Sequence, residues 1–263
     1  MPVPQRPRLR KREILFAVAM GGLAAGGAAL VLDESNDGGA PMIVVNAAPQ
    51  TYELAPFEGI STVGPQDVVV TFGETQSVRS EGSPEALGQL EVVVEDGELL
   101  IRPRNQFRFG FDWGSLRGAT YHVTVPRLES VSLAGSGDIR VDRVRGDSFT
   151  GTIAGPGEIA IADMQVDEAD FRIGGSGNVV VAGTAREAKV AIGGSGEVRA
   201  AGLRSETADI SIGGSGDVAL TVQDEARVSI AGSGDVDITG PASCSVTKMG
   251  SGEVSCAGGG GTD

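Results

Sequence analysis

The chain is poor in the residues from which most enzyme active sites are built. Its 263 residues include one histidine, two cysteines and one tryptophan, and aromatic residues make up 4% of the total. A single histidine leaves little material for acid–base catalysis. Glycine, by contrast, is abundant at 41 residues, which is typical of a chain made of short strands and tight turns.

Positive charge is also scarce. The formal net charge is -14 at pH 7. Five basic residues lie at the start of the chain with no acid before Glu13, namely Arg6, Arg8, Arg10, Lys11 and Arg12. The remainder therefore carries -14 - 5 = -19. A surface of this sign repels phosphates, so we expect no nucleic-acid partner.

One long hydrophobic run is present, close to the N-terminus. The segment from Ile14 to Leu32 has 19 residues without a charge and lies directly after the basic cluster. Basic residues stay cytoplasmic, so the chain beyond this run is predicted to be exported. Residues 1–32 are therefore predicted to form a hydrophobic helix that is either a signal peptide or a membrane anchor, with residues 14–32 in the membrane if they are not cleaved. Residues 33–51 are predicted to be a flexible linker.

A phrase of two glycines around one small residue recurs seven times between residues 135 and 253. Apolar residues alternate with polar or small ones on both sides, at positions -4, -2, +4 and +6 from the first glycine, with Gly151 and Lys248 as exceptions. Alternation indicates strands, and a fixed period indicates stacked repeats. The first glycines, at steps of 20, 20, 19, 20, 18 and 18 residues, are Gly135, Gly155, Gly175, Gly194, Gly214, Gly232 and Gly250.

Stacking gives every strand a parallel partner, whereas isolated hairpins would leave each repeat with an unpaired edge. We therefore predict an all-β, single-stranded parallel β-helix of about 18–20 residues per coil over residues 52–256. Residues 52–126 carry the pattern weakly, as at Gly64-Pro65-Gln66-Asp67, and are predicted to be irregular first coils. Residues 127–256 form the regular repeats, and residues 257–263 a disordered tail. The pattern leaves the number of faces open.

The two cysteines lie at the end of the array. Cys244 and Cys256 stand six residues before and after Gly250, at inward positions of the last repeat. An even pair in an exported chain favours a disulfide, two buried thiols being the alternative. A bridge at this place would hold a terminal coil that has no neighbour beyond it.

Several segments, in chain order, are similar to those of a known family. They are Pro56-Phe57-Glu58-Gly59-Ile60, Gly64-Pro65-Gln66-Asp67-Val68-Val69-Val70, Ser77-Val78-Arg79-Ser80-Glu81-Gly82, Thr124-Val125-Pro126 and the Gly-Ser-Gly-Asp array. Over about residues 52–256 they resemble the bacterial head GIN domain, also called putative auto-transporter adhesin. The resemblance implies a right-handed parallel β-helix on an exported envelope protein, with adhesion suggested by the family's name and no catalytic residues supplied. Pro156 departs from the pattern, because the other regular repeats have serine there.

A column of acids and one amide stands directly after the second glycine of each phrase. Stacking would place neighbouring side chains about 5 Å apart, where like charges repel. A calcium-binding face is one hypothesis; we favour the alternative that these side chains accept local backbone hydrogen bonds and stay solvated, with no metal bound. The column consists of Asp138, Glu158, Asn178, Glu197, Asp217, Asp235 and Glu253.

An aromatic segment interrupts the repeat pattern between Ile101 and Tyr121. Exposed aromatic rings beside arginine are typical of a loop that contacts sugar or membrane, and such a loop can equally cover the open end of a solenoid. We favour the cap. The residues concerned are Phe107, Arg108, Phe109, Phe111 and Trp113.

These features favour a non-enzymatic, exported protein of the cell envelope, in the periplasm or at the cell surface. We expect it to act as an adhesin or interaction module that binds a surface glycan or protein, with no cofactor. A passive periplasmic structural module is the alternative. A carbohydrate-active enzyme is less favoured, because the one histidine, His122, lies in a strand-like stretch without an evident nucleophile.

Overall fold

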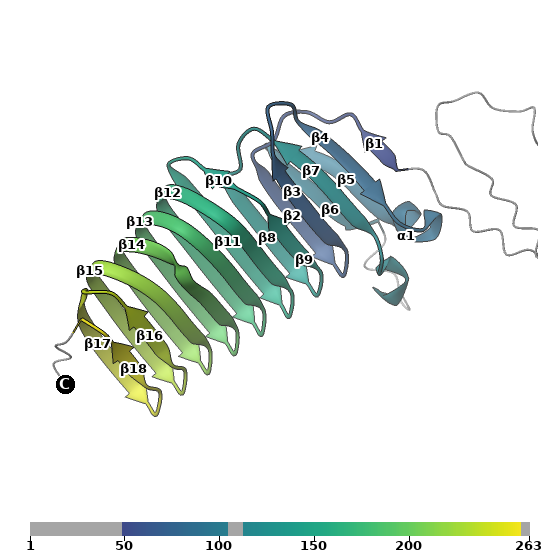
Figure 1. Cartoon of the computed structure of the whole chain (residues 1–263). Helices are drawn as coiled ribbons and strands as arrows, with labels where there is room; N and C mark the ends of the chain where they lie inside the picture. Colours follow the sequence, from purple (N-terminus) through teal and green to yellow (C-terminus); the bar gives the residue numbers. More distant parts are fainter. Residues whose placement is uncertain (1–48, 105–112, 259–263) are drawn as a thin grey trace, which may run out of the picture. The chain divides into compact units, whose positions relative to one another are not determined.

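The computed structural model describes residues 49–104 and 113–258, so the predicted N-terminal helix and nearly all of the linker lie outside the described residues. The described residues form 18 strands joined in one sheet that coils into a solenoid. Figure 1 shows the successive coils stacked side by side. The prediction of a parallel β-helix is confirmed.

The regular coils begin after residue 126 and pair in parallel throughout. In the middle coils most residues belong to one long bent strand, along which buried and exposed side chains alternate with few breaks. The strands are β8 (Ser130–Gly135), β9 (Asp138–Val141), β10 (Val144–Arg145), β11 (Ser148–Gly155), β12 (Glu158–Gly175), β13 (Asn178–Gly194), β14 (Glu197–Gly214), β15 (Asp217–Gly232), β16 (Val236–Thr239), β17 (Ser243–Gly250) and β18 (Val254–Cys256).

Each regular coil has three faces. Along β12 the buried side chains run in three groups, and the alternation changes phase twice between them. Since side chains of a strand alternate sides, each change of phase marks a bend of the backbone. The third bend is the glycine phrase itself. The groups are Ile159 and Ile161, then Met164 and Val166, then Ala169, Phe171 and Ile173.

The coils differ in length, yet the glycine phrases stay in register. Gly175 pairs with Gly194, which pairs with Gly214, and the ladder continues to Gly250. Register shifts occur instead after the first face, as between Ile161 and Met164. Extra residues are therefore absorbed at the other bends, and the glycine bend is the fixed line of the stack.

The first glycine of each phrase has a backbone conformation that only glycine adopts without strain. At Gly214 the φ angle is 137°, and a Cβ atom would lie 2.1 Å from the carbonyl oxygen of Gly194 in the preceding coil. The close stacking of these turns therefore requires the missing side chain.

Gly151 breaks the aliphatic column for a different reason. A Cβ atom there would lie 2.9 Å from the Phe171 ring, which fills the space of the expected side chain. The rings of Phe149 and Phe171 also contact each other, with centroids 6.3 Å apart. Two aromatic side chains thus replace the missing aliphatic volume at this level of the core.

Before the regular coils, the spatial order of the layers differs from the chain order. The elements before the regular coils are β1 (Gln50–Tyr52), β2 (Gly59–Gly64), β3 (Asp67–Phe72), β4 (Ser77–Glu81), α1 (Pro84–Gln89), β5 (Leu90–Glu95), β6 (Glu98–Pro103), η2 (Trp113–Leu116) and β7 (Thr120–Val125). The layer of β2 and β3 packs against β8 and β9 on one side and against the later strands β6 and β7 on the other. The strands β1, β4 and β5 then pair antiparallel at the outside.

The two ends of the described solenoid are closed to different extents. At the end formed by β6 and β7, the short helix α1 and the segment η2 lie against the core, and Ala86, Leu87 and Leu116 are buried. At the other end no element covers β17 and β18 within residues 49–104 and 113–258, and Val246 and Val254 are only half-buried. Figure 1 shows α1 at the end opposite to β18.

Among the residues that the structure describes, no helix has the length and apolar character needed to cross a membrane.

Candidate functional site

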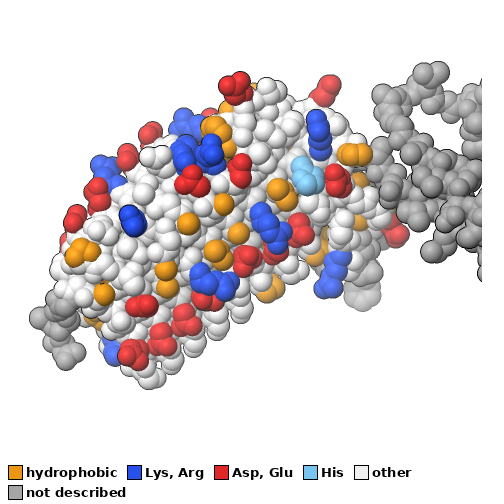
Figure 2. All heavy atoms as spheres, viewed as in Figure 1, with side chains coloured by type: hydrophobic (Ala, Val, Ile, Leu, Met, Phe, Trp, Pro, Cys, Tyr) orange, Lys and Arg blue, Asp and Glu red, His pale blue; other side chains and the backbone are white. Residues whose placement is uncertain are grey.

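The acidic column lies along the glycine bend, as predicted from the repeat. Parallel pairing sets Glu158 between Asp138 and Asn178, and Glu197 between Asn178 and Asp217. Figure 2 shows acidic side chains in a row along the edge at which the strands turn in Figure 1. The column therefore forms a ladder at the surface, partly exposed in the earlier coils and exposed at Asp217, Asp235 and Glu253, with one side chain per coil.

Two aspartates of the ladder, and the equivalent Asp67, accept hydrogen bonds from the neighbouring coil. Asp67, at the equivalent place in the first layer, accepts a hydrogen bond from the backbone N–H of Asp138 at 3.0 Å. Asp217 accepts from Asp235 at 3.0 Å, and Asp235 accepts from Glu253 at 2.8 Å. An aspartate is short enough to reach the backbone of the next coil, so these carboxylates contribute to the fold.

The other charged members of the ladder in the earlier coils pair with arginine. Arg140 Nη2 lies 2.7 Å from Asp138 Oδ2. Arg199 lies between two glutamates, 3.3 Å from Glu158 and 3.6 Å from Glu197. These ion pairs offset the repulsion between stacked carboxylates.

Towards the C-terminal end the ladder has fewer cations beside it. Asp217, Asp235 and Glu253 line a shallow cavity of about 230 Å³ together with Asp237, and no Lys or Arg lines it. In the described ranges, no three His, Cys, Asp or Glu residues are grouped closely enough to hold a metal ion. Cation binding by the ladder stays a hypothesis from the sequence.

A second set of charges lies on the adjacent face of the solenoid. Lys189 Nζ lies 2.7 Å from Glu168 and 3.3 Å from Glu187. The hydrogen bonds to Glu168 and Glu187 raise the pKa of Lys189 above its ordinary value. Such exposed pairs each contribute little to stability, and their main effect is a surface of alternating charge.

The predicted interaction or cap loop falls largely outside the described residues. Phe107, Arg108, Phe109 and Phe111 lie there, and of Trp113 only the backbone is described, as the first residue of η2. The choice between cap and interaction loop therefore stays a prediction. Two arginines that precede the segment have partners: Arg102 pairs with Glu91 and Glu95, and Arg104 Nε donates to the carbonyl oxygen of Leu90.

The single histidine lies at the protein surface. His122 is exposed on β7, and its Nε2 atom lies 3.7 Å from a carboxylate oxygen of Glu81. Within the described part of the chain, no serine or threonine hydroxyl is hydrogen-bonded to it. The grouping of nucleophile, base and orienting acid that acyl-transfer enzymes use is not assembled around this histidine.

The predicted disulfide between Cys244 and Cys256 is confirmed. Their Cα atoms lie 6.6 Å apart, and the bond joins β17 to β18 across the last coil. Cys244 belongs to the column of Ala226 and Cys256 to the column of Ile238. The two cysteines are therefore the last members of two stacked rows of core side chains, and the disulfide joins these rows at the uncovered end.

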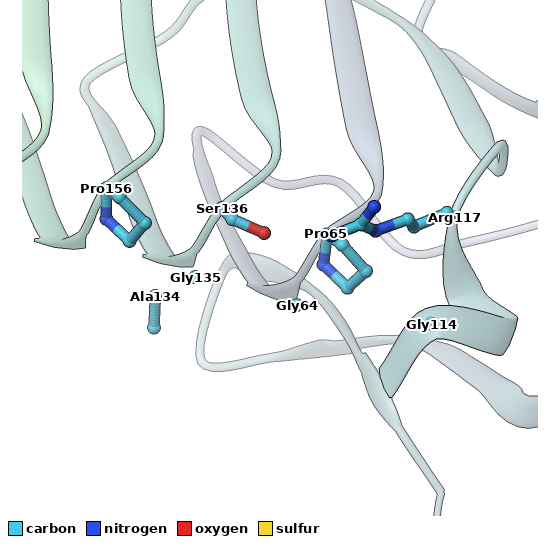
Figure 3. A pocket seen from close by; sticks show the side chains of 8 residues that line it. All are labelled: Gly64, Pro65, Gly114, Arg117, Ala134, Gly135, Ser136 and Pro156. Carbon is cyan, nitrogen blue, oxygen red and sulfur yellow. The ribbon is translucent and has the colours of Figure 1, made fainter. Parts of the chain in front are cut away.

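A cavity of about 350 Å³ lies beside the glycine bend at the capped end of the solenoid. Sequence reasoning missed this site, because it is formed by residues that lie far apart in the chain. Figure 3 shows Arg117 extending from the η2 side toward the turn of Pro65, with Ser136 and Pro156 on the next two turns. The lining residues are Gly64, Pro65, Gly114, Arg117, Ala134, Gly135, Ser136 and Pro156.

One signal of this cavity was visible in the sequence. The residue between the two glycines is serine in all the regular repeats except at Pro156, and the first layer carries Pro65 at the equivalent place. Both prolines line the cavity, on either side of Ser136. The two turns that carry proline in place of serine, at Pro65 and Pro156, therefore lie close together in space.

Comparison with known proteins matches a family model and several solved structures. The model described as putative auto-transporter adhesin, head GIN domain, matches residues 56–242. No curated protein matches the chain.

The similar structures share the fold at low sequence identity. A putative adhesin from Bacteroides fragilis has a TM-score of 0.71 and 20% identity, covering 79% of this chain and 95% of its own. A putative lipid binding protein from Parabacteroides distasonis has a TM-score of 0.63 and 19% identity, covering 80% and 96%. A putative adhesin from Parabacteroides merdae has a TM-score of 0.60 and 18% identity, covering 79% and 95%.

Proposed function

Because the chain belongs to the family described as putative auto-transporter adhesin, head GIN domain, we propose that it is an exported, non-enzymatic adhesion or interaction module of the cell envelope. Its ligand is a surface glycan or a protein of another cell or matrix. The observation that carries the proposal is the match of the family model to residues 56–242, a range that includes the glycine bends of all but the last coil.

The surface of the solenoid supports a binding role. Its described part presents long, regular faces of exposed polar and charged side chains, which suit contact with an extended partner. In the part of the chain that the structure describes, no serine or threonine hydroxyl is hydrogen-bonded to the one histidine. The function of a protein is determined by the residues of its sites and not by its fold. These features therefore favour a binding protein over an enzyme.

The disulfide supports an oxidising compartment. Structural disulfides persist in the periplasm and outside the cell and are rare in the cytoplasm. Cell fractionation, with the mass of the mature N-terminus, tests this part of the proposal. A mature chain that begins after residue 32 indicates a cleaved signal peptide, and an intact chain in the membrane fraction indicates an anchor. Recovery of the intact chain in the cytoplasm would refute export.

A glycan and extracellular-matrix array tests adhesion directly. We expect reproducible binding of the full chain to at least one glycan or matrix protein, and weaker binding after substitution of exposed residues on one face. Absence of binding to every array member would favour the passive structural module. Release of reducing sugar from a polysaccharide by the purified chain would favour the enzyme instead.

A further inference from the structure

An exposed arginine, Arg117, lines the cavity at the capped end of the solenoid. In the part of the chain that the structure describes, most arginines lie within 4.0 Å of a carboxylate. The Arg117 side chain has no such neighbour among those residues and is exposed, and no acid lines the cavity. An unpaired guanidinium beside a concave surface attracts an anion, and its planar pair of N–H donors matches a carboxylate.

The walls of the cavity are apolar. The rings of Pro65 and Pro156 and the methyl group of Ala134 line it. Pro65, Ser136 and Pro156 lie on three successive turns of the stack, so the exposed hydroxyl group of Ser136 stands between the two prolines. A sugar ring has an apolar C–H face and a rim of hydroxyl groups, so it can pack on proline while it hydrogen-bonds to serine.

Two glycine carbonyl groups at this cavity are already hydrogen-bonded to the next coil. The carbonyl oxygen of Gly64 accepts from the N–H groups of Ser136 and Gly137, each at 3.2 Å, and that of Gly135 accepts from Gly157 at 3.1 Å. An extended peptide binds most readily to a free strand edge, where it adds a strand. These turns offer no such edge, which favours a saccharide over a peptide.

We propose that this cavity binds an acidic saccharide, a sugar ring that bears a carboxylate. Arg117 pairs with the carboxylate, Pro65 and Pro156 pack on the ring, and Ser136 hydrogen-bonds to a ring hydroxyl. The inference rests on the proposed adhesive function and assigns a ligand class and a place to it.

The test is a titration of the full, ¹⁵N-labelled chain with D-glucuronate, monitored by NMR at the side-chain Nε–Hε signal of Arg117 and the amide of Ser136. D-glucose, acetate and a short peptide with a free C-terminus serve as comparison ligands. We expect saturable shifts with glucuronate at millimolar concentration, and at least about tenfold weaker binding of each comparison ligand, because each lacks the charge or the ring.

Two variants locate the site. Arg117→Ala should weaken glucuronate binding at least about tenfold, since it removes a charge-assisted hydrogen bond. Pro156→Ser restores the residue found in the other regular repeats and should weaken glucuronate binding without affecting the fold. Arg204→Ala is the matched control, because Arg204 is also exposed and, in the described residues, has no carboxylate within 4.0 Å.

The outcomes separate this inference from the proposed function. Equal binding of acetate or of glucose, tighter binding of the peptide, or no effect of Arg117→Ala would each overturn the saccharide site. If the chain binds an array glycan and Arg117→Ala leaves that binding intact, adhesion stands and this cavity is refuted as its site. If glucuronate binds at Arg117 while no array member binds, the site stands and the adhesive function falls.

Discussion

Asp235 Oδ1 accepts a hydrogen bond from the backbone N–H of Glu253, one coil later, at 2.8 Å. The carboxylate thus takes the N–H that in the middle coils bonds to a glycine carbonyl, as Glu197 does to Gly177 at 3.1 Å. The acidic ladder is therefore part of the coil-to-coil bonding of the solenoid.

Replacement of Asp235 by alanine should loosen the last coil. The loss of an exposed, charge-assisted hydrogen bond costs about 1 kcal/mol. We expect hydrogen exchange at the Glu253 amide to become about fivefold faster. Asp235→Asn keeps an oxygen acceptor and should change the rate less.

Asp237→Ala is the control, because it removes the same charge from an exposed neighbour for which no hydrogen bond is present among the described residues. If Asp237→Ala accelerates exchange at Glu253 as much as Asp235→Ala does, the effect comes from charge and not from the hydrogen bond.

Two adjacent glycines should respond in opposite ways to alanine. At Gly214 a Cβ atom would lie 2.1 Å from the Gly194 carbonyl oxygen, whereas at Gly213 the nearest atom lies 3.8 Å away. We expect Gly214→Ala to destabilise the chain by about 3 kcal/mol through strain and crowding. Gly213→Ala should be neutral or slightly stabilising, since alanine restricts the unfolded chain.

Urea unfolding monitored by circular dichroism measures both variants. The equivalent positions Ala154 and Ala231 already carry alanine, which supports the tolerance expected at Gly213. Similar unfolding midpoints for the two variants would contradict the close stacking of the glycine bends.

The strands on either side of the glycine bend could be predicted from the sequence, because alternation in a strand is read directly from residues such as Ile192 and Val198. The face between them could not. Met164 and Val166 lie between two bends, and the alternation of buried and exposed side chains changes phase at each bend, so the period-two pattern is lost.

The two ends also differ in how far the sequence predicts them. The disulfide could be predicted from the position of two cysteines in one repeat. The layer order at the other end could not, because β6 and β7 come after β2 and β3 in the chain yet pack outside them. The cavity at Arg117 depends on this arrangement and was therefore not predictable from local pattern.

Removal of the disulfide should affect the last coil alone. In a solenoid each coil contacts only its neighbours, so a local loss does not spread far. For the double variant Cys244→Ser and Cys256→Ser we expect a local loss of up to about 3 kcal/mol. Hydrogen exchange measured by mass spectrometry should be faster in β17 and β18 and unchanged in β12 and β13.

Reduction of the wild-type chain should give the same pattern of exchange. Faster exchange over the whole solenoid after either treatment would show that the bridge stabilises all coils together, contrary to the nearest-neighbour account.

Lys248 is expected to limit association at the uncovered end. It pairs with Ile230 in the preceding coil and so occupies the end of an aliphatic core column, but it is exposed. A charge at such a position on an edge strand opposes pairing with another chain, because pairing would bury it without a partner. The other end is covered by α1 and Leu116, so the described solenoid has one open end.

Lys248→Ile should therefore promote association of two chains through their last coils. Because one open end per chain allows a closed pair and no filament, we expect dimers only. Sedimentation equilibrium should give a dimer dissociation constant at least about tenfold lower than that of the wild type, as the cost of burying the charge disappears.

Lys248→Gln keeps a polar group and should remain close to the wild type. A folded Lys248→Ile variant that associates no more than the wild type would show that this end is protected by something other than the lysine, and species larger than dimers would show that the capped end also pairs.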